Sequence, residues 1–103
     1  MSLLSIFGLG TNLKAALRKG AVVIDIRTAY ECDQGRVPGA INIPVDRIAV
    51  SIPRIKGMNR PVIVCGAYKI HSSAAARILR ENGVKKVYDG GNWQNIMKMH
   101  NRL

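Results

Sequence analysis

The fold is decided by the stretch Val62-Ile63-Val64-Cys65-Gly66-Ala67-Tyr68-Lys69-Ile70-His71-Ser72-Ser73-Ala74-Ala75-Ala76. Its apolar beginning predicts a buried strand, and its alanine-rich end predicts a helix. Cys65 would then lie at the mouth of a tight loop that faces the N-terminus of this helix. Free backbone N–H groups and the helix dipole stabilise a thiolate there, and such sites lower a cysteine pKa from about 8.5 to roughly 3.5–7.5.

Apolar runs of strand length alternate with helical segments on both sides of this stretch. We expect strands over residues 21–26, 40–43, 62–65 and 84–88, and helices over residues 13–19, 28–33, 45–51, 72–82 and 93–100. Pro53 is expected to end the helix over 45–51, and Met1–Gly10 to form a lead-in strand or a cap over the core. This alternation predicts an α/β fold with a mainly parallel sheet that helices cover on both faces.

Two interpretations of Cys65 follow from its position. Ligands of open parallel sheets bind at the carboxyl ends of the strands, which is where Cys65 is expected, so it is a candidate nucleophile. Free cysteines are also among the most buried residues, so Cys65 is equally a candidate for a small apolar core residue.

Composition narrows the range of partners. The chain has 103 residues, the size of one domain, with 16 Lys and Arg against six Asp and Glu, a formal net charge of +10. This charge attracts small anions and allows loose binding to nucleic acid or acidic surfaces. Because the cations are spread along the chain and aromatic residues are few, nucleic-acid binding is not expected as the main function. The apolar N-terminus lacks the basic start of a secretory signal, and no membrane span is expected.

Cys32 and Cys65 are the two cysteines of the chain. They are too few for a disulfide scaffold, and their spacing does not suggest a zinc site, so no metal is predicted and a reducing compartment, the cytoplasm, is expected. Cys32 could resolve an intermediate on Cys65 only if their Cα atoms lay about 4.4–6.8 Å apart. A buried packing role for Cys32 is the favoured interpretation.

Four segments resemble the rhodanese-like domains, in the same order along the chain. The resemblance covers about residues 12–100, and Arg36 stands where the family usually has His. The segments are Asp25-Ile26-Arg27, with Glu31 shortly after; Gly35-Arg36-Val37-Pro38-Gly39-Ala40-Ile41-Asn42-Ile43-Pro44; Val62–Cys65 with the following loop; and Val87-Tyr88-Asp89-Gly90-Gly91-Asn92-Trp93.

The resemblance implies one domain over residues 1–103 with a small, mostly parallel five-stranded sheet and helices on both faces. It also implies a sulfurtransferase. Cys65 would take a sulfane sulfur from a small anionic donor such as thiosulfate, become a persulfide, and pass the sulfur to cyanide or to a protein thiol. No metal or organic cofactor is required. The expected substrate-binding residues are Gly66, Ala67, Tyr68, Lys69, Ile70, His71, Ser72 and Arg27.

Several of these residues also have structural interpretations. Lys69 either holds the anionic donor or is a solvated surface lysine. His71 and Ser72 are favoured as residues that shape the loop and cap the helix. Arg27 is favoured as an ion-pair partner of Glu31, with a contact to the anion as the alternative, and Asp25 is expected to accept hydrogen bonds from loop backbone N–H groups.

The spacing after Cys65 leaves two further functions open. Five residues separate Cys65 from His71, one more than many sulfurtransferases have before their closing Arg or Thr. A loop of that length resembles the phosphatase branch of the fold and predicts an arsenate or phosphate site, although His71 cannot form the bidentate contact of the Arg used there. The second alternative is a non-catalytic rhodanese-like module that binds a partner or senses a signal.

Overall fold

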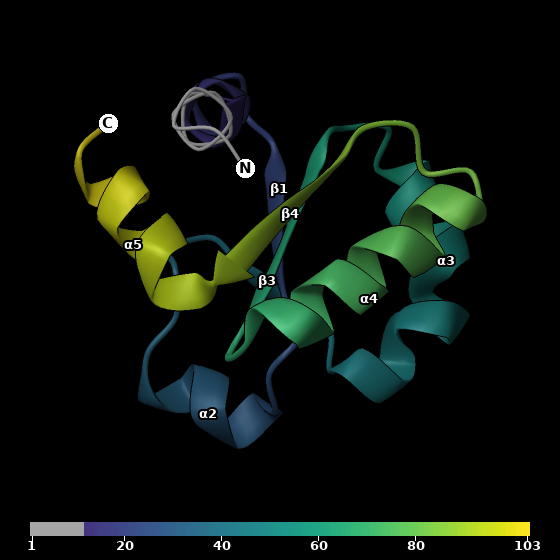
Figure 1. The fold of residues 1–103 in the computed structure, drawn as a ribbon, viewed down its shortest axis with the longest axis horizontal. Helices are drawn as coiled ribbons and strands as arrows, with labels where there is room; N and C mark the ends of the chain where they lie inside the picture. The colour runs from purple at the N-terminus through teal and green to yellow at the C-terminus, as the bar shows by residue number, and fades with distance from the viewer. Residues whose placement is uncertain (1–11) are drawn as a thin grey trace.

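The computed structural model describes residues 12–103, which form a parallel sheet between two helical layers (Figure 1). The predicted α/β fold is confirmed. Within the described residues the sheet has four strands rather than the expected five, and the lead-in strand or cap expected over Met1–Gly10 lies outside these residues. The strands, in the order β2-β1-β3-β4, are β1 Val22–Asp25, β2 Ile41–Asn42, β3 Val62–Gly66 and β4 Val87–Asn92.

Helices pack on both faces of this sheet. One face is covered by α3 (Ile48–Gly57) and α4 (Lys69–Glu81), which bury Ile55 and Leu79 against β1 and β3. The other face is covered by the helix over residues 12–18 and by α5 (Trp93–Asn101), which buries Ile96. The sheet therefore separates two apolar clusters, and the face to which a strand residue points decides its surroundings.

Helix α2 (Ala29–Gln34) follows β1 almost directly, as the prediction over residues 28–33 anticipates. Thr28 caps it with a capping box, in which the Thr28 hydroxyl accepts from the backbone N–H of Glu31 and the Glu31 carboxylate accepts from that of Thr28. The cap fixes the turn of the chain at the carboxyl end of β1.

The prediction of a helix over residues 45–51 is wrong in the type of its first turn and in the position of its C-terminal end. Val45–Arg47 form a 3₁₀ turn, η1, and α3 then continues through Pro53 to Gly57. Proline inside a helix removes one backbone hydrogen bond. The helix nevertheless continues because Ile48 and Ile55, on its buried side, both pack into the core.

The last strand begins three residues later than predicted. Val84 is buried as expected, but its backbone N–H donates to the carbonyl of Leu79 at 3.0 Å and closes the end of α4. Gly83 takes φ +89°, the left-handed conformation typical of a helix stop. Because this N–H is used by the helix, pairing with β3 starts only at Val87.

Strand β4 carries a bulge opposite the end of β3. Val64 pairs with Asp89 and Cys65 with Gly91, so Gly90 is the extra residue. A Cβ at Gly90 would lie 2.9 Å from both the side chain of Ile63 and the carbonyl oxygen of Val64, and glycine is therefore required here. The bulge directs Asp89 towards the start of α4.

Candidate functional site

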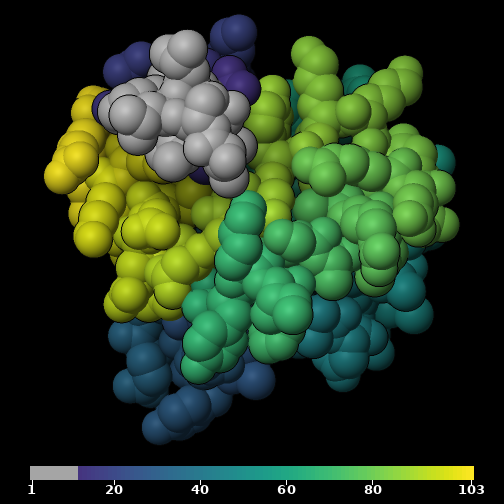
Figure 2. Space-filling model, viewed as in Figure 1, coloured from purple at the N-terminus to yellow at the C-terminus, as the bar shows by residue number. Residues whose placement is uncertain are grey.

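The link between β3 and α4 is only two residues long. Gly66 is the last residue of β3 and Lys69 the first of α4, which leaves Ala67 and Tyr68 between them. The expectation of a five-residue loop after Cys65 is therefore wrong, because Gly66 still belongs to β3 and Lys69 already belongs to α4. Figure 2 shows the teal-green residues of this link next to the blue α2, at one end of the molecule.

Cys65 lies inside the core and does not face α4. Its side chain is 0% exposed and packs with Ile63 and Ile96 on the face covered by α5. The expectation that its thiol faces the N-terminus of α4 is wrong, because α4 covers the opposite face, where Val62 and Val64 point. Side chains alternate along a strand, so Cys65 shares its face with Ile63.

The surroundings of Cys65 keep its thiol protonated. Burial raises the pKa of Cys65 far above its ordinary value, and the negative charge of Asp25 raises it further, while Arg27 offsets only a part. The lowered pKa expected from the sequence is therefore contradicted. A protonated, buried thiol is a poor nucleophile, so the geometry matches the interpretation of Cys65 as a small core residue. Cys32 is buried as predicted.

The next position, Gly66, is the one that faces α4. A Cβ at Gly66 would lie 2.9 Å from Cγ1 of Ile26, whose side chain packs in the cluster under α4. At the end of β3, the start of α4 therefore faces the backbone of Gly66 and the side chain of Ile26.

Arg27 is held in a buried ion pair with Asp25. Its Nη2 lies 2.8 Å and its Nε 3.0 Å from the Asp25 carboxylate, which also accepts from the backbone N–H of Arg27, as predicted for Asp25. Nη2 further donates to the carbonyl of Gly35 at 2.6 Å, and the guanidinium lies 3.9 Å from the ring centre of Trp93. The ion pair expected with Glu31 is wrong, because the Glu31 carboxylate is bound in the cap of α2.

Lys69 and Ser72 meet on a carboxylate that the sequence analysis did not single out, Asp89. The Lys69 ammonium lies 2.8 Å from one Asp89 oxygen, and the Ser72 hydroxyl donates to the other at 2.6 Å. The Ser73 hydroxyl and the Gly91 N–H also donate to Asp89. The predicted cap role of Ser72 is wrong, since Tyr68 occupies the N-cap position without a side-chain hydrogen bond.

Asp89 is a charged anchor between β4 and α4. Partial burial by itself would raise its pKa, but the donors Lys69, Ser72, Ser73 and the Gly91 N–H together hold the pKa below its ordinary value. The sequence signal for this role is an acid directly before Gly90-Gly91 in a strongly basic chain. An internal carboxylate therefore occupies the place beside Lys69 at which an anionic substrate was expected.

We expect Asp89→Asn to lower the free energy of unfolding at pH 7 by about 1.5–3 kcal/mol, the range for hydrogen bonds to a charged group. The stability that Asp89 contributes is complete above its ordinary pKa of 3.8 and is lost as pH falls through its lower folded-state value. Denaturant titrations between pH 7 and pH 2 should therefore show the two proteins converging in acid. A difference that stays constant down to pH 2 would contradict this role of the carboxylate.

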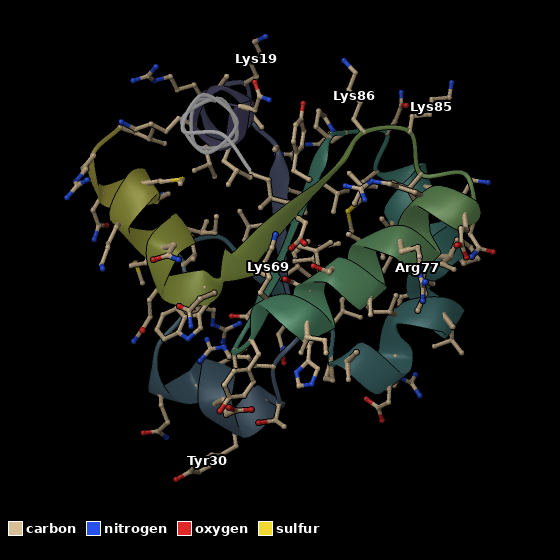
Figure 3. The ribbon with its side chains drawn as sticks, in the orientation of Figure 1. Lys19, Tyr30, Lys69, Arg77, Lys85 and Lys86 are labelled. Atoms are coloured by element: carbon tan, nitrogen blue, oxygen red, sulfur yellow. The ribbon has the colours of Figure 1, made fainter. Side chains whose placement is uncertain are left out.

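Of the remaining predicted residues, Ala67 is half-buried, and Tyr68, Ile70 and His71 are exposed at the carboxyl edge of the sheet. Tyr68 is 66% and Ile70 74% exposed, and the ring of the exposed His71 stands edge-on to Tyr68 with 5.7 Å between ring centres. Tyr30 of α2, which the sequence analysis missed, is 74% exposed at the same edge and points outwards (Figure 3). This edge thus carries apolar and aromatic side chains in solvent, a pattern typical of contact surfaces.

Residues 12–103 contain no group of three His, Cys, Asp or Glu side chains placed to hold a metal ion. Within the same range, no helix is both long and apolar enough to cross a membrane.

Comparison with known families agrees with the fold. The sequence model of the family described as Rhodanese-like domain matches residues 10–94, which is most of the chain. The chain belongs to the rhodanese-like domain family. The solved structure "rhodanese with anions from E. coli" superposes on this rhodanese-like domain with a TM-score of 0.66 and 30% identity, covering 74% of this chain and 91% of that one.

Two curated relatives of this rhodanese-like domain have different names. It is 35% identical over 75 residues to the thiosulfate sulfurtransferase GlpE of Shewanella oneidensis, covering 71% of this chain and 73% of the relative. It is 38% identical over 71 residues to the HTH-type transcriptional regulator Rv0324 of Mycobacterium tuberculosis, covering 66% of this chain. The chain spans only 31% of the length of that regulator. Similar rhodanese-like domains thus occur in a sulfurtransferase and inside a larger regulator.

Proposed function

We propose that this rhodanese-like domain is a binding module that does not transfer sulfur through Cys65. The single observation that carries the proposal is the position of Cys65, which is fully buried on the face of the sheet opposite α4. The raised pKa of its thiol supports the proposal further. The contact surface is the carboxyl edge, where Tyr30, Tyr68 and Ile70 are exposed, and the partner is a protein with a complementary apolar patch.

Sulfur transfer is the second candidate, favoured by the 35% identity with a thiosulfate sulfurtransferase. In this function Cys65 takes sulfur from thiosulfate or a similar anion and passes it as a persulfide to a thiol. Gly66, Ala67, Tyr68, Lys69, Ile70, His71, Ser72 and Arg27 would bind the substrate. Because Cys65 is covered from all sides, the link Ala67–Tyr68 and its neighbours would have to open before each turnover.

Either function fits a reducing compartment, and we propose the cytoplasm. Both Cys32 and Cys65 are free thiols in the structure. Disulfides are rare where glutathione and thioredoxin keep thiols reduced.

Incubation of the reduced protein with thiosulfate is the deciding experiment. We expect the intact mass to show no gain of a sulfur atom, because a buried, protonated Cys65 cannot attack the donor. Iodoacetamide should modify Cys65 only under conditions that unfold the protein. Cys65→Ala serves as the matched variant, since it keeps a small apolar side chain in the same cluster.

Sulfur transfer through Cys65 would give the opposite result in this experiment. A sulfur adduct that cyanide removes, and that Cys65→Ala lacks while its circular dichroism is unchanged, would overturn the binding module and establish the sulfurtransferase. The partner surface is tested separately, with Tyr68→Ser and Ile70→Ser, which should abolish binding to the partner and leave the melting temperature nearly unchanged.

A further inference from the structure

A concave site lies at the amino edge of the sheet, at the opposite end of the strands from Tyr68. It is a hollow of about 330 Å³ between the end of α3, the turn after α4 and the residues that lead into β3. Its floor is apolar and consists of Ile55, Pro61 and Val84. The volume lies at the lower end of the range for small-molecule sites, about 300–1,000 Å³.

Four cations surround this apolar floor: Lys56, Arg60, Lys85 and Lys86. The lining includes no Asp or Glu. Among residues 12–103, no carboxylate forms an ion pair with any of the four, and residues 1–11 contain no acidic residue. Like charges gathered without a counter-charge repel one another, and an anion bound among them relieves that repulsion.

Two of the cations have defined positions. Arg60 donates from Nε to the carbonyl of Gly20 at 3.0 Å and again from Nη2, so its guanidinium is held, while Nη1 has no hydrogen-bond partner among residues 12–103. Lys56 reaches across to the turn after α4, where its Nζ would lie only 3.1 Å from a Cβ at Gly83. The site is thus built from two segments that the fold brings together.

The charge extends beyond the hollow itself. Figure 3 shows Lys19, Lys85 and Lys86 projecting from the same edge of the molecule. Arg60 connects the hollow to the part of this edge around Lys19, because the carbonyl that accepts its hydrogen bond belongs to Gly20, the neighbour of Lys19. An approaching anion therefore meets a positive field before it reaches the hollow.

We propose that this hollow binds an organic phosphate, with the phosphates among Lys56, Arg60, Lys85 and Lys86 and the organic part on Ile55, Pro61 and Val84. A purely inorganic anion would leave the apolar floor in contact with water, and an uncharged molecule would leave the cations unpaired. A mononucleotide has both parts in one molecule of suitable size. This inference goes beyond the partner surface at the carboxyl edge and does not depend on it.

Calorimetric titration with ADP, without divalent metal and at about 0.1 M ionic strength, tests the proposal. We expect ADP to bind at least about tenfold more tightly than pyrophosphate, and adenosine not to bind measurably, because both parts of the ligand contribute. The triple variant Lys56→Gln/Lys85→Gln/Lys86→Gln should lose ADP affinity by more than about tenfold. Arg60 is left intact in this variant because it also holds Gly20.

The matched control removes three cations elsewhere, in Arg36→Gln/Arg47→Gln/Arg77→Gln, and has the same net charge. It should keep ADP affinity within about twofold, since screening weakens the effect of distant charges. Equal losses in both variants would overturn the proposal, because attraction would then come from net charge alone. If pyrophosphate bound as tightly as ADP, the apolar floor would contribute nothing to binding, and the proposal of an organic phosphate would be overturned. Binding of a single-stranded RNA with no binding of ADP would make the edge a nucleic-acid surface and overturn it too.

Discussion

Asp25→Ala is expected to lower the free energy of unfolding by about 3–5 kcal/mol, the cost of removing one partner from a buried ion pair. The Asp25 carboxylate is fully buried and receives Nε, Nη2 and the backbone N–H of Arg27. Without it, the guanidinium stays buried with only backbone carbonyls and the Trp93 ring around it. Urea titration monitored by circular dichroism measures the loss.

The control for this prediction is an exposed ion pair in the same chain. Asp33 and Arg36 lie 3.5 Å apart on the surface, so Asp33→Ala should change stability by less than about 1 kcal/mol. The double variant Asp25→Leu/Arg27→Met should be more stable than Asp25→Ala, since no charge is then left unpaired. A double variant as unstable as Asp25→Ala would show that the loss comes from packing and not from the charge.

Gly66→Cys combined with Ile26→Ala is expected to create the reactive thiol that Cys65 does not provide. Position 66 is the last of β3 and faces α4, so a thiol there approaches the unpaired N–H groups of the first turn. Ile26→Ala makes room, because it removes Cγ1 and Cδ1 of Ile26, the two atoms that a Cβ at Gly66 would meet. Iodoacetamide should modify the introduced thiol at least about a hundredfold faster than Cys65, which reacts only in the rare unfolded state.

Peptide mapping by mass spectrometry identifies which cysteine has reacted, and alkylation between pH 5 and pH 10 gives its pKa. Ile26→Ala alone is the control and should leave Cys65 protected. An introduced thiol as slow as Cys65 would refute the assignment of position 66 to the side of α4. A fast reaction at Cys65 in the control would instead show that opening of the native protein exposes the core.

The sequence was informative where a pattern extends over several residues. The apolar strands predicted the parallel sheet, and the helix expected over residues 28–33 is close to the observed α2, Ala29–Gln34. In these cases many residues contribute to one conclusion, so an error of one position does not change it.

The candidate site depends on single positions, and there the sequence was a poor guide. Side chains alternate along a strand, so a shift of one residue exchanges the two faces. Whether Cys65 or Gly66 faces α4 is decided by where β3 ends, and strand ends are the least certain part of a prediction from sequence.

Helix α4 shows a second limit. Ser72 and Ser73 are typical caps, yet the helix already begins at Lys69, and both serine hydroxyls bind Asp89 instead of capping it. This partner lies on another strand, so no local pattern could show it.

The strand order β2-β1-β3-β4 has a consequence for how the chain acquires its structure. Each neighbouring pair is parallel, so each must be joined by a crossover, and none can form as a hairpin. Strand β1 leaves the ribosome early, but its central partner β3 follows only after α2 and α3. The central β1–β3 pairing therefore waits until residue 66 has been synthesised, and only the short pairing of β1 with β2 can precede it.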